Sequence, residues 1–212
     1  MPELGRRERK KQLTRQTLVN EAVRLFTAKG YDQTSVADIA EAADVSKRTF
    51  FLHFATKEDV LLADGGRRVD LAVQAVEARA PGTPIREVLA EAARAMIADT
   101  ASADLPSGLA ALRAHLVITT PAVQARALHT AFAAQARIAE ALHRAYPQEI
   151  DEVAAATVVG ALMGAVGAAA VTSLQRGEPP ERTHAAMQRA AGIALHCLES
   201  PHLSGPAGGA AS

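Results

Sequence analysis

The sequence contains no tryptophan, one cysteine, and only seven phenylalanine and tyrosine residues among 212 residues. A single cysteine, Cys197, excludes a disulfide within the chain. Because 49% of the residues are hydrophobic, the chain can still bury a substantial core. Five of the aromatic residues fall within the first 57 positions, which indicates a small region that packs by itself: Phe26, Tyr31, Phe50, Phe51 and Phe54.

Motifs of catalysis and of metal binding are also missing. The chain has no glycine-rich phosphate loop, no HExxH and no CxxC. His115, His129 and His143 recur every fourteen residues, but Pro121 separates the first two and no carboxylate stands at metal-site spacing beside them. His196 and Cys197 are adjacent, so on a helix they point to different faces. We therefore expect neither an enzyme nor a metal or cofactor site.

Strand patterns and an N-terminal signal are absent too. No stretch alternates apolar and polar residues as a strand would, so the sequence predicts an all-α fold. Without an apolar N-terminal signal, the expected location is the cytoplasm. Beyond residue 56 the periodicity predicts helices over 57–79, 85–98, 108–118, 121–146, 150–175 and 178–198. The Pro-, Gly- and Ala-rich residues 200–212 predict a disordered tail.

The segment Thr34–Leu62, TSVADIAEAADVSKRTFFLHFATKEDVLL, predicts two short helices joined by a tight turn. Ser35 can cap the first helix and pair with Asp38 three residues later. Asp44 stands at the turn, where aspartate tolerates a left-handed backbone. Ser46 can cap the second helix, whose first turn then exposes three side chains in the manner of a helix-turn-helix facing the major groove of DNA: Lys47, Arg48 and Thr49.

The charges are unevenly divided, although the whole chain is neutral. The first 57 residues hold eleven Lys and Arg against seven Asp and Glu, whereas the remainder holds twelve against sixteen. Positive charge therefore accompanies the predicted helix-turn-helix, as contact with phosphates requires. Six of the basic residues predict an arm ahead of the first helix that reaches DNA, with a solvated terminus as the alternative: Arg6, Arg7, Arg9, Lys10, Lys11 and Arg15.

Residues 14–62 resemble the TetR family of one-component transcriptional regulators. The resemblance rests on Gly30-Tyr31, Thr34-Ser35-Val36, Val45-Ser46-Lys47-Arg48-Thr49-Phe50-Phe51, His53-Phe54 and Lys57-Glu58-Asp59. It implies that Thr49, Phe51 and His53 contact DNA and that Lys57 holds a backbone phosphate. Three positions depart from the usual family pattern, since Asp44 and Arg48 replace glycine and Phe51 replaces tyrosine. The predicted DNA-binding residues are Ser35, Ser46, Lys47, Arg48, Thr49, Phe51, His53 and Lys57.

Val153–Leu174 contains no charged residue and is long enough to cross a membrane. It is, however, rich in alanine and glycine and lacks flanking aromatic anchors, so packing against another helix is favoured. Gly160, Gly164 and Gly167 share one face, which allows close approach of a helix from the same chain or from a second subunit. The resemblance favours the second subunit, because the TetR-like fold pairs its last two long helices across a dimer.

These observations predict a homodimeric regulator with three parts. Residues 1–56 would be the basic arm and DNA-binding domain, 57–199 a helical domain for effector binding and dimerisation, and 200–212 a disordered tail. We predict a repressor that binds a palindromic operator and is released by a small apolar or amphiphilic molecule. The alternative is a helix-turn-helix regulator controlled by a protein partner. The predicted effector-pocket residues are Met96, His115, His129, Phe132 and Met163.

Overall fold

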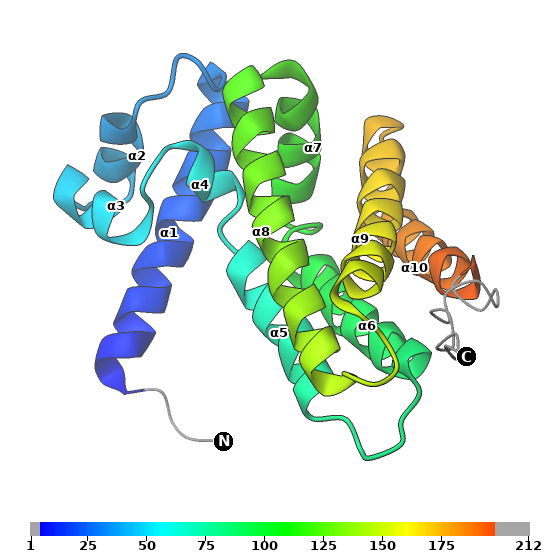
Figure 1. The fold of residues 1–212 in the computed structure, drawn as a ribbon. Helices are drawn as coiled ribbons and strands as arrows, with labels where there is room; N and C mark the ends of the chain where they lie inside the picture. The colour runs from blue at the N-terminus through cyan, green and yellow to red at the C-terminus, as the bar shows by residue number, and fades with distance from the viewer. Residues whose placement is uncertain (1–4, 198–212) are drawn as a thin grey trace, which may run out of the picture. The chain divides into compact units, whose positions relative to one another are not determined.

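The computed structural model describes residues 5–197. Within that range the chain is all-helical and has no strand, which confirms the predicted fold class. Figure 1 shows the order of the elements. The helices are α1 (Arg6–Lys29), α2 (Val36–Ala42), α3 (Lys47–His53), α4 (Glu58–Leu61), α5 (Gly65–Glu77), α6 (Ile85–Ala103), α7 (Leu109–Thr119), α8 (Pro121–Ala145), α9 (Glu152–Gln175) and α10 (Pro180–Cys197). The predicted tail 200–212 lies outside the described residues.

The chain packs as two compact units that are not contiguous in sequence. Unit 1 consists of the described residues up to Ala63 together with Ser107–Ala127, and unit 2 consists of Asp64–Pro106 with the described residues from Leu128 onward. Helix α8 therefore contributes its first turns to unit 1 and the rest to unit 2. The predicted functional domains 1–56 and 57–199 divide the chain by role, not by packing, and stay a prediction.

The core of unit 1 joins aromatic and aliphatic side chains from helices far apart in the sequence. Phe26 and Tyr31 pack with ring centroids 5.2 Å apart, and Phe50 is fully buried. Segment 107–127 completes this core through three buried aliphatic residues: Leu109, Leu116 and Val123. Removing those side chains would uncover the apolar faces of α1 and α4, so α7 and the start of α8 are structural parts of unit 1.

The prediction of a basic arm ahead of the first helix is wrong. Helix α1 begins at Arg6, so the six basic residues lie on the helix itself. The physical reason is that arginine, lysine, glutamate and glutamine are good helix formers and no breaker stands between Gly5 and Gly30. Glu8 in the first turn also interacts favourably with the helix dipole.

The prediction of one helix over 57–79 is also wrong, because the chain leaves the helix at Leu62–Asp64 and divides it into α4 and α5. Two arginines from other helices hold carbonyl groups at the break. Arg113 donates to the carbonyl of Leu61 at 3.2 Å and Arg15 to that of Ala63 at 2.6 Å. The following Gly65-Gly66 pair further weakens a continuous helix. The break coincides with the boundary between the two units.

Unit 2 is a bundle of α5, α6, α9, α10 and most of α8, with a core rich in alanine and valine. A buried ionic cluster joins α5 to the end of α6. Arg68 lies 3.1 Å from the carboxylate of Asp99 and 2.6 Å from that of Asp104. All three side chains are almost fully buried, so losing one partner would leave an uncompensated charge in the core. Helix α6 also runs five residues beyond its predicted end at Ala98.

Helix α9 is the most apolar helix of the described residues. By length and composition alone it could cross a membrane, with a mean hydropathy of 1.9, yet one such helix is weak evidence for a span. Only 22% of its most apolar window is buried within the single chain. Its exposed side is uncharged and includes Val153, Gly164 and Ala168. The single chain therefore leaves much of the apolar surface of α9 uncovered.

Candidate functional site

The turn between α2 and α3 has the geometry that the sequence predicts. Ser35 caps α2, accepting from the amide of Asp38 at 3.2 Å, while the Asp38 carboxylate accepts from the amide of Ser35 at 2.7 Å. The hydrogen bonds from Ser35 lower the pKa of Asp38. Asp44 has φ 52°, the left-handed backbone expected at the turn. Ser46 then caps α3, accepting from the amide of Thr49 at 3.0 Å.

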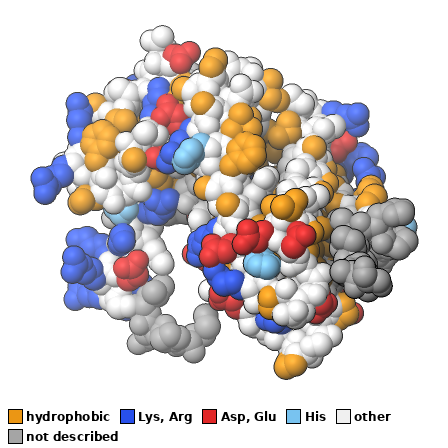
Figure 2. All heavy atoms as spheres, in the orientation of Figure 1, with side chains coloured by type: hydrophobic (Ala, Val, Ile, Leu, Met, Phe, Trp, Pro, Cys, Tyr) orange, Lys and Arg blue, Asp and Glu red, His pale blue; other side chains and the backbone are white. Residues whose placement is uncertain are grey.

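Helix α3 is held by one buried side and offers the opposite side to solvent. Phe50 is fully buried, whereas Lys47, Arg48, Phe51 and Leu52 are exposed. These four side chains are spaced as two i, i+4 pairs, so they form one continuous face. Figure 2 shows Lys and Arg side chains gathered over α3 and over the first turns of α1. The pair of basic residues at the start of α3 makes this face suited to a polyanion.

Arg15 fixes the far end of α3 from α1. Its guanidinium donates to the carbonyl of His53 at 2.8 Å and lies 4.2 Å from the ring centroid of Phe54. The guanidinium of Arg15 thus holds parts of unit 1 together, and its predicted contact with DNA stays a prediction. Partial burial, and then the charges of Arg15 and Lys11, lower the pKa of His53. The lowered pKa favours the neutral form of the His53 imidazole.

Lys57 also carries a structural role beside its predicted phosphate contact. Its ammonium donates to the carbonyl oxygens of Tyr31 at 2.8 Å and Thr34 at 3.0 Å, and it lies 3.8 Å from the centroid of the Tyr31 ring. The Tyr31 hydroxyl donates to Glu58, and burial followed by this hydrogen bond raises the pKa of Tyr31. The ammonium is therefore already held within unit 1, and its contact with a DNA phosphate stays a prediction.

Helix α4 is held in place from both α7 and α8. Besides the hydrogen bond from Arg113 to Leu61, Arg126 of α8 lies 2.6 Å from the carboxylate of Asp59. Asp59 in turn accepts from the amide of Thr56 at 3.1 Å, which fixes the start of α4. Arg126 thereby links the first turns of α8 to the helix that carries Lys57 at its N-terminus.

Unit 2 contains a cavity of about 170 Å³ between α5, α6, α8 and α9. Every side chain that lines it is apolar, so a water molecule inside would find no side-chain partner. An engineered cavity of about 150 Å³ with similar lining in another protein stays dry and binds benzene. The cavity is lined by Ala72, Leu89, Ala92, Ala93, Met96, Ile97, Ile138, Val159, Leu162, Met163, Val166 and Gly167.

The structure brings together two of the five predicted pocket residues. Met96 and Met163 both line the cavity, while His115, His129 and Phe132 do not. Those three side chains are exposed, Phe132 at 68%. Phe132 stands six residues before Ile138, about 120° away around the helix. The sequence analysis chose these residues by side-chain type. Which side chains of α8 reach the cavity depends instead on their direction around the helix axis. A ligand-binding role for any of the five stays a prediction.

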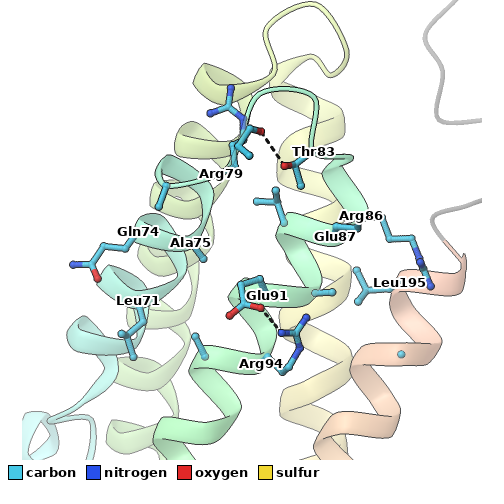
Figure 3. A pocket seen from close by; sticks show the side chains of 16 residues that line it. Leu71, Gln74, Ala75, Arg79, Thr83, Arg86, Glu87, Glu91, Arg94 and Leu195 are labelled. Atoms are coloured by element: carbon cyan, nitrogen blue, oxygen red, sulfur yellow. Dashed lines mark hydrogen bonds and ion pairs between the residues drawn. The ribbon is translucent and has the colours of Figure 1, made fainter.

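A second hollow is an open groove of about 730 Å³ bordered by α5, α6 and α10. Figure 3 shows its mixed lining, in which Leu71, Ala75 and Leu195 alternate with charged side chains. Arg94 pairs with Glu91, and the guanidinium of Arg79 lies 4.6 Å from the ring centroid of Tyr146. The charges along this groove are therefore of both signs and partly paired.

The three glycines of the predicted dimer interface do not have equal surroundings. A Cβ built on Gly160 would lie 3.8 Å from the side-chain oxygen of Gln135, so this glycine is partly covered by α8. A Cβ on Gly164 or Gly167 would meet nothing within 4 Å. These two positions are exposed, and Gly167 also borders the cavity. Within residues 5–197 no group of three or more His, Cys, Asp and Glu could hold a metal ion.

Sequence reasoning missed Leu52, a leucine on α3 that is 71% exposed. The signal was present in the spacing, because Leu52 follows Arg48 by four residues and therefore shares its face. Sequence reasoning also missed the roles of Arg113 and Arg126, which no local pattern could reveal. Their partners, Leu61 and Asp59, stand 52 and 67 residues earlier in the chain.

Comparison with known proteins gives similarities that cover the capped helices and much of the rest of the chain. A family model described as "Bacterial regulatory proteins, tetR family" matches residues 18–63. The chain is 33% identical over 166 residues to the HTH-type transcriptional regulator TcmR of Streptomyces glaucescens, an alignment that covers 77% of this chain and 74% of TcmR.

Solved structures show the same fold at lower sequence identity. FadR of Thermus thermophilus, a TetR family transcriptional repressor in complex with lauroyl-CoA, has a TM-score of 0.56 and 24% identity, covering 92% of this chain and 100% of that one. The fatty acid degradation regulator FadR from Bacillus halodurans has a TM-score of 0.61 and 20% identity, covering 88% and 96%. These similarities establish the architecture of both units.

Proposed function

We propose that this chain, which belongs to the TetR family of bacterial regulatory proteins and is a DNA-binding transcriptional regulator, represses transcription as a homodimer on a palindromic operator and is released by a small-molecule effector. The observation that carries the proposal is the exposed face of α3. Two caps and the buried Phe50 hold this face outward, with Lys47 and Arg48 at its start. A rigid helix with this presentation is suited to the major groove.

The DNA contacts divide by chemistry into base reading and phosphate binding. We assign base reading to Lys47, Arg48 and Thr49, because side chains in the first turn of a recognition helix reach base edges. We assign phosphate contacts to Ser35 and Lys57, which lie at helix starts outside that turn. Ser46 fixes the start of α3, Phe51 belongs to its exposed face, and the half-buried His53 lies at its end. All eight residues are those that the sequence predicts.

A second copy of this chain is our proposed cover for the exposed side of α9. The surface is apolar, uncharged and lined by small residues, including Gly164 and Gly167, so two such helices can approach closely. A dimer related by a two-fold axis would present two α3 helices to two half-sites of opposite orientation. The operator should therefore be an inverted repeat with half-site centres about one helical turn apart, or a small multiple.

For the effector we propose a small apolar or amphiphilic molecule bound in the cavity of unit 2. The support is the lining of the cavity, which offers apolar contacts and the flexible side chains of Met96 and Met163. The FadR relative from Thermus thermophilus binds lauroyl-CoA, a ligand with an apolar chain. At 24% identity this relative is a precedent for the fold only, so the cavity of this chain is what supports the ligand class.

The proposed release mechanism is a population shift. The effector binds better to a conformation whose two α3 helices no longer match the operator spacing. The equilibrium between the two conformations shifts by the ratio of the effector's affinities for them. Helix α8 can carry the signal, because it contributes Ile138 to the cavity and Arg126 to the ion pair with Asp59 of α4. Movement of α4 then changes the position of α3. We further propose that the protein catalyses no reaction and acts in the cytoplasm.

The first experiment is selection of operator DNA from random duplexes by the full chain, followed by footprinting. We expect an inverted repeat protected on both halves, and a single unsymmetrical half-site would contradict the dimeric arrangement. A thermal-shift screen of apolar compounds, followed by gel shift, tests the effector. A compound that binds should raise the melting temperature and lower the affinity for the operator. Operator DNA should in turn lower the affinity for that compound by the same factor. Release from DNA that requires a protein and no small molecule would favour the alternative, a helix-turn-helix regulator controlled by a protein partner.

A further inference from the structure

Helix α3 exposes two large apolar side chains next to each other on the face that carries its positive charge. Leu52 is 71% exposed and Phe51 is 55% exposed. Single exposed hydrophobic residues are common on protein surfaces and need no explanation. Here, however, the two lie on a seven-residue helix whose other exposed positions, Lys47 and Arg48, are basic.

The geometry of unit 1 keeps this apolar pair in solvent in the absence of a partner. The ring of Phe51 packs edge-on against buried Phe50, with centroids 5.5 Å apart and planes at 84°. Arg15 holds the end of α3 through the His53 carbonyl, and Ser46 holds its start. The helix is therefore fixed at both ends, and Leu52 cannot turn inward to join the core without disrupting these contacts.

A leucine side chain has no hydrogen-bond donor or acceptor, so it can read only one feature of the major groove. That feature is the C5-methyl group of thymine, which is apolar and projects from the base edge. Lys47 and Arg48 neutralise phosphates or read guanines beside it, so the combined face fits DNA and not an apolar protein groove. When the leucine contacts the methyl group, both leave water, and this hydrophobic burial stabilises the contact.

We propose that Leu52 is a specificity-determining residue that recognises a thymine methyl group in each operator half-site. The proposal rests on the proposed DNA-binding function and goes beyond it, because it names the base feature that the second turn of α3 selects. Phe51 lies beside Leu52 and restricts the space around that methyl group. The selected half-site should accordingly contain at least one thymine opposite the second turn of α3.

Deoxyuridine provides a sharp test, because it differs from thymidine only by the missing methyl group and keeps the same hydrogen-bonding edge. The full chain is first used to select operator DNA, and each thymine of the half-site is then replaced singly by deoxyuridine. At the position read by Leu52 we expect affinity to fall about fourfold, the value for one buried methylene-sized group. Leu52→Ala should bind the thymine and deoxyuridine operators equally well.

Two variants act as controls. Leu13→Ala removes a leucine of equal exposure, 69%, from α1 of the same unit and should keep the fourfold discrimination. Phe51→Ala tests the neighbouring side chain. Since Leu52 is largely exposed, Leu52→Ala should keep the melting temperature of the parent, and the deoxyuridine series on the parent protein stands independently of any variant.

Three outcomes would overturn the assignment. They are a selected half-site without thymine, a parent protein insensitive to every deoxyuridine replacement, and discrimination that survives in Leu52→Ala. Discrimination lost in Phe51→Ala but kept in Leu52→Ala would move the reading to Phe51. Failure to select any DNA would instead contradict the proposed function itself, so the two failures are distinguishable.

Discussion

The two units differ in what fills their cores. Unit 1 buries four aromatic side chains, Phe26, Tyr31, Phe50 and Phe54, among larger aliphatic residues. The buried core of unit 2 contains a single aromatic residue, Tyr146, and eight alanines. Large rigid rings give a core that fixes α3 in one position, whereas small side chains leave room between helices. The cavity of about 170 Å³ lies in the alanine-rich unit, where three of its lining residues are Ala72, Ala92 and Ala93.

The helix starts separate the two units less sharply than the cores do. In unit 1, α2 and α3 begin with serine side chains that accept hydrogen bonds from backbone amides. Unit 2 has both kinds of helix start, because Asp151 caps α9 by accepting from the amide of Ala154 at 2.7 Å, whereas α5 and α6 begin without a side-chain cap. Caps contribute about 1 kcal/mol each and fix where a helix starts. Both helices of the helix-turn-helix therefore have starts that nearby residues specify.

The largest effect is expected from Gly164→Leu, which tests whether a second copy covers unit 2. A Cβ at Gly164 meets nothing within 4 Å in the single chain, so the folded monomer accommodates the leucine. At a two-fold interface the clash occurs twice, at about 1–3 kcal/mol for each copy. Analytical ultracentrifugation should show monomer where the parent is dimeric. Gly66→Leu is the control, because Gly66 is a helical glycine of α5 with equally open surroundings. A dimeric Gly164→Leu protein would place the interface elsewhere.

One substitution made in both units sharpens the comparison of their cores. Ala22→Leu overpacks unit 1, where Ala22 is fully buried, and should lower the free energy of unfolding by about 1–3 kcal/mol. Ala93→Leu points the same added atoms into the cavity of unit 2 and should change that free energy by less than about 1 kcal/mol. Urea unfolding measures both. Ala93→Leu should also abolish effector-induced release while operator binding persists. Equal destabilisation by the two variants would mean that the cavity cannot be filled.

Within unit 1, Lys57 and Arg48 separate phosphate binding from base reading. Lys57→Ala should weaken binding to all DNA sequences and reduce the salt slope by about 1, because one phosphate contact is lost. It should also cost stability, since the ammonium holds the carbonyls of Tyr31 and Thr34. Arg48→Ala should instead change the preference among operator variants. Lys29→Ala, which removes an equal charge at the end of α1, should leave the slope unchanged. A uniform loss in Arg48→Ala would assign that residue to phosphate binding.

The smallest effect concerns pH and His53. Burial and the charges of Arg15 and Lys11 lower its pKa, which favours the neutral imidazole in the free protein. Nearby phosphates favour the protonated form, so DNA binding takes up a proton and affinity should rise as pH falls below about 6.5. Stability changes in the opposite direction, because the unfolded chain protonates first and the free energy of unfolding decreases over that window.

His53→Gln should flatten the pH profile of DNA binding, while His129→Gln, at an exposed position of α8 in unit 2, should leave it intact. Fluorescence anisotropy at constant ionic strength between pH 5.5 and 7.5 measures the profile, and the gain should not exceed about tenfold for each unit of pKa change. A parent profile that is flat, or a profile unaffected by His53→Gln, would remove His53 from the DNA contact surface.

The caps at Ser35 and Ser46 and the turn at Asp44 could be predicted because each depends on residues within a few positions. The break between α4 and α5 could not, since it is held by Arg15 and Arg113 from distant parts of the chain. The same limit explains the cavity. Met96 and Met163 have the helical phase that reaches it, but choosing Phe132 by side-chain type ignored that phase. Contacts between distant segments, not residue chemistry, determine these features.

The division of unit 1 into two sequence segments bears on how regulators of this kind can be recombined. A hybrid regulator that takes only residues up to Ala63 from this chain would lack Leu109, Leu116 and Val123, and with them the buried apolar contacts against α1 and α4. It would also lose Arg126, the ionic partner of Asp59. A hybrid protein that is to take over the operator specificity of this chain must therefore also receive residues 107–127. Otherwise the corresponding residues of the recipient must be redesigned. The sequence that builds unit 1 is therefore larger than its helix-turn-helix, and residues 64–106 of unit 2 interrupt it.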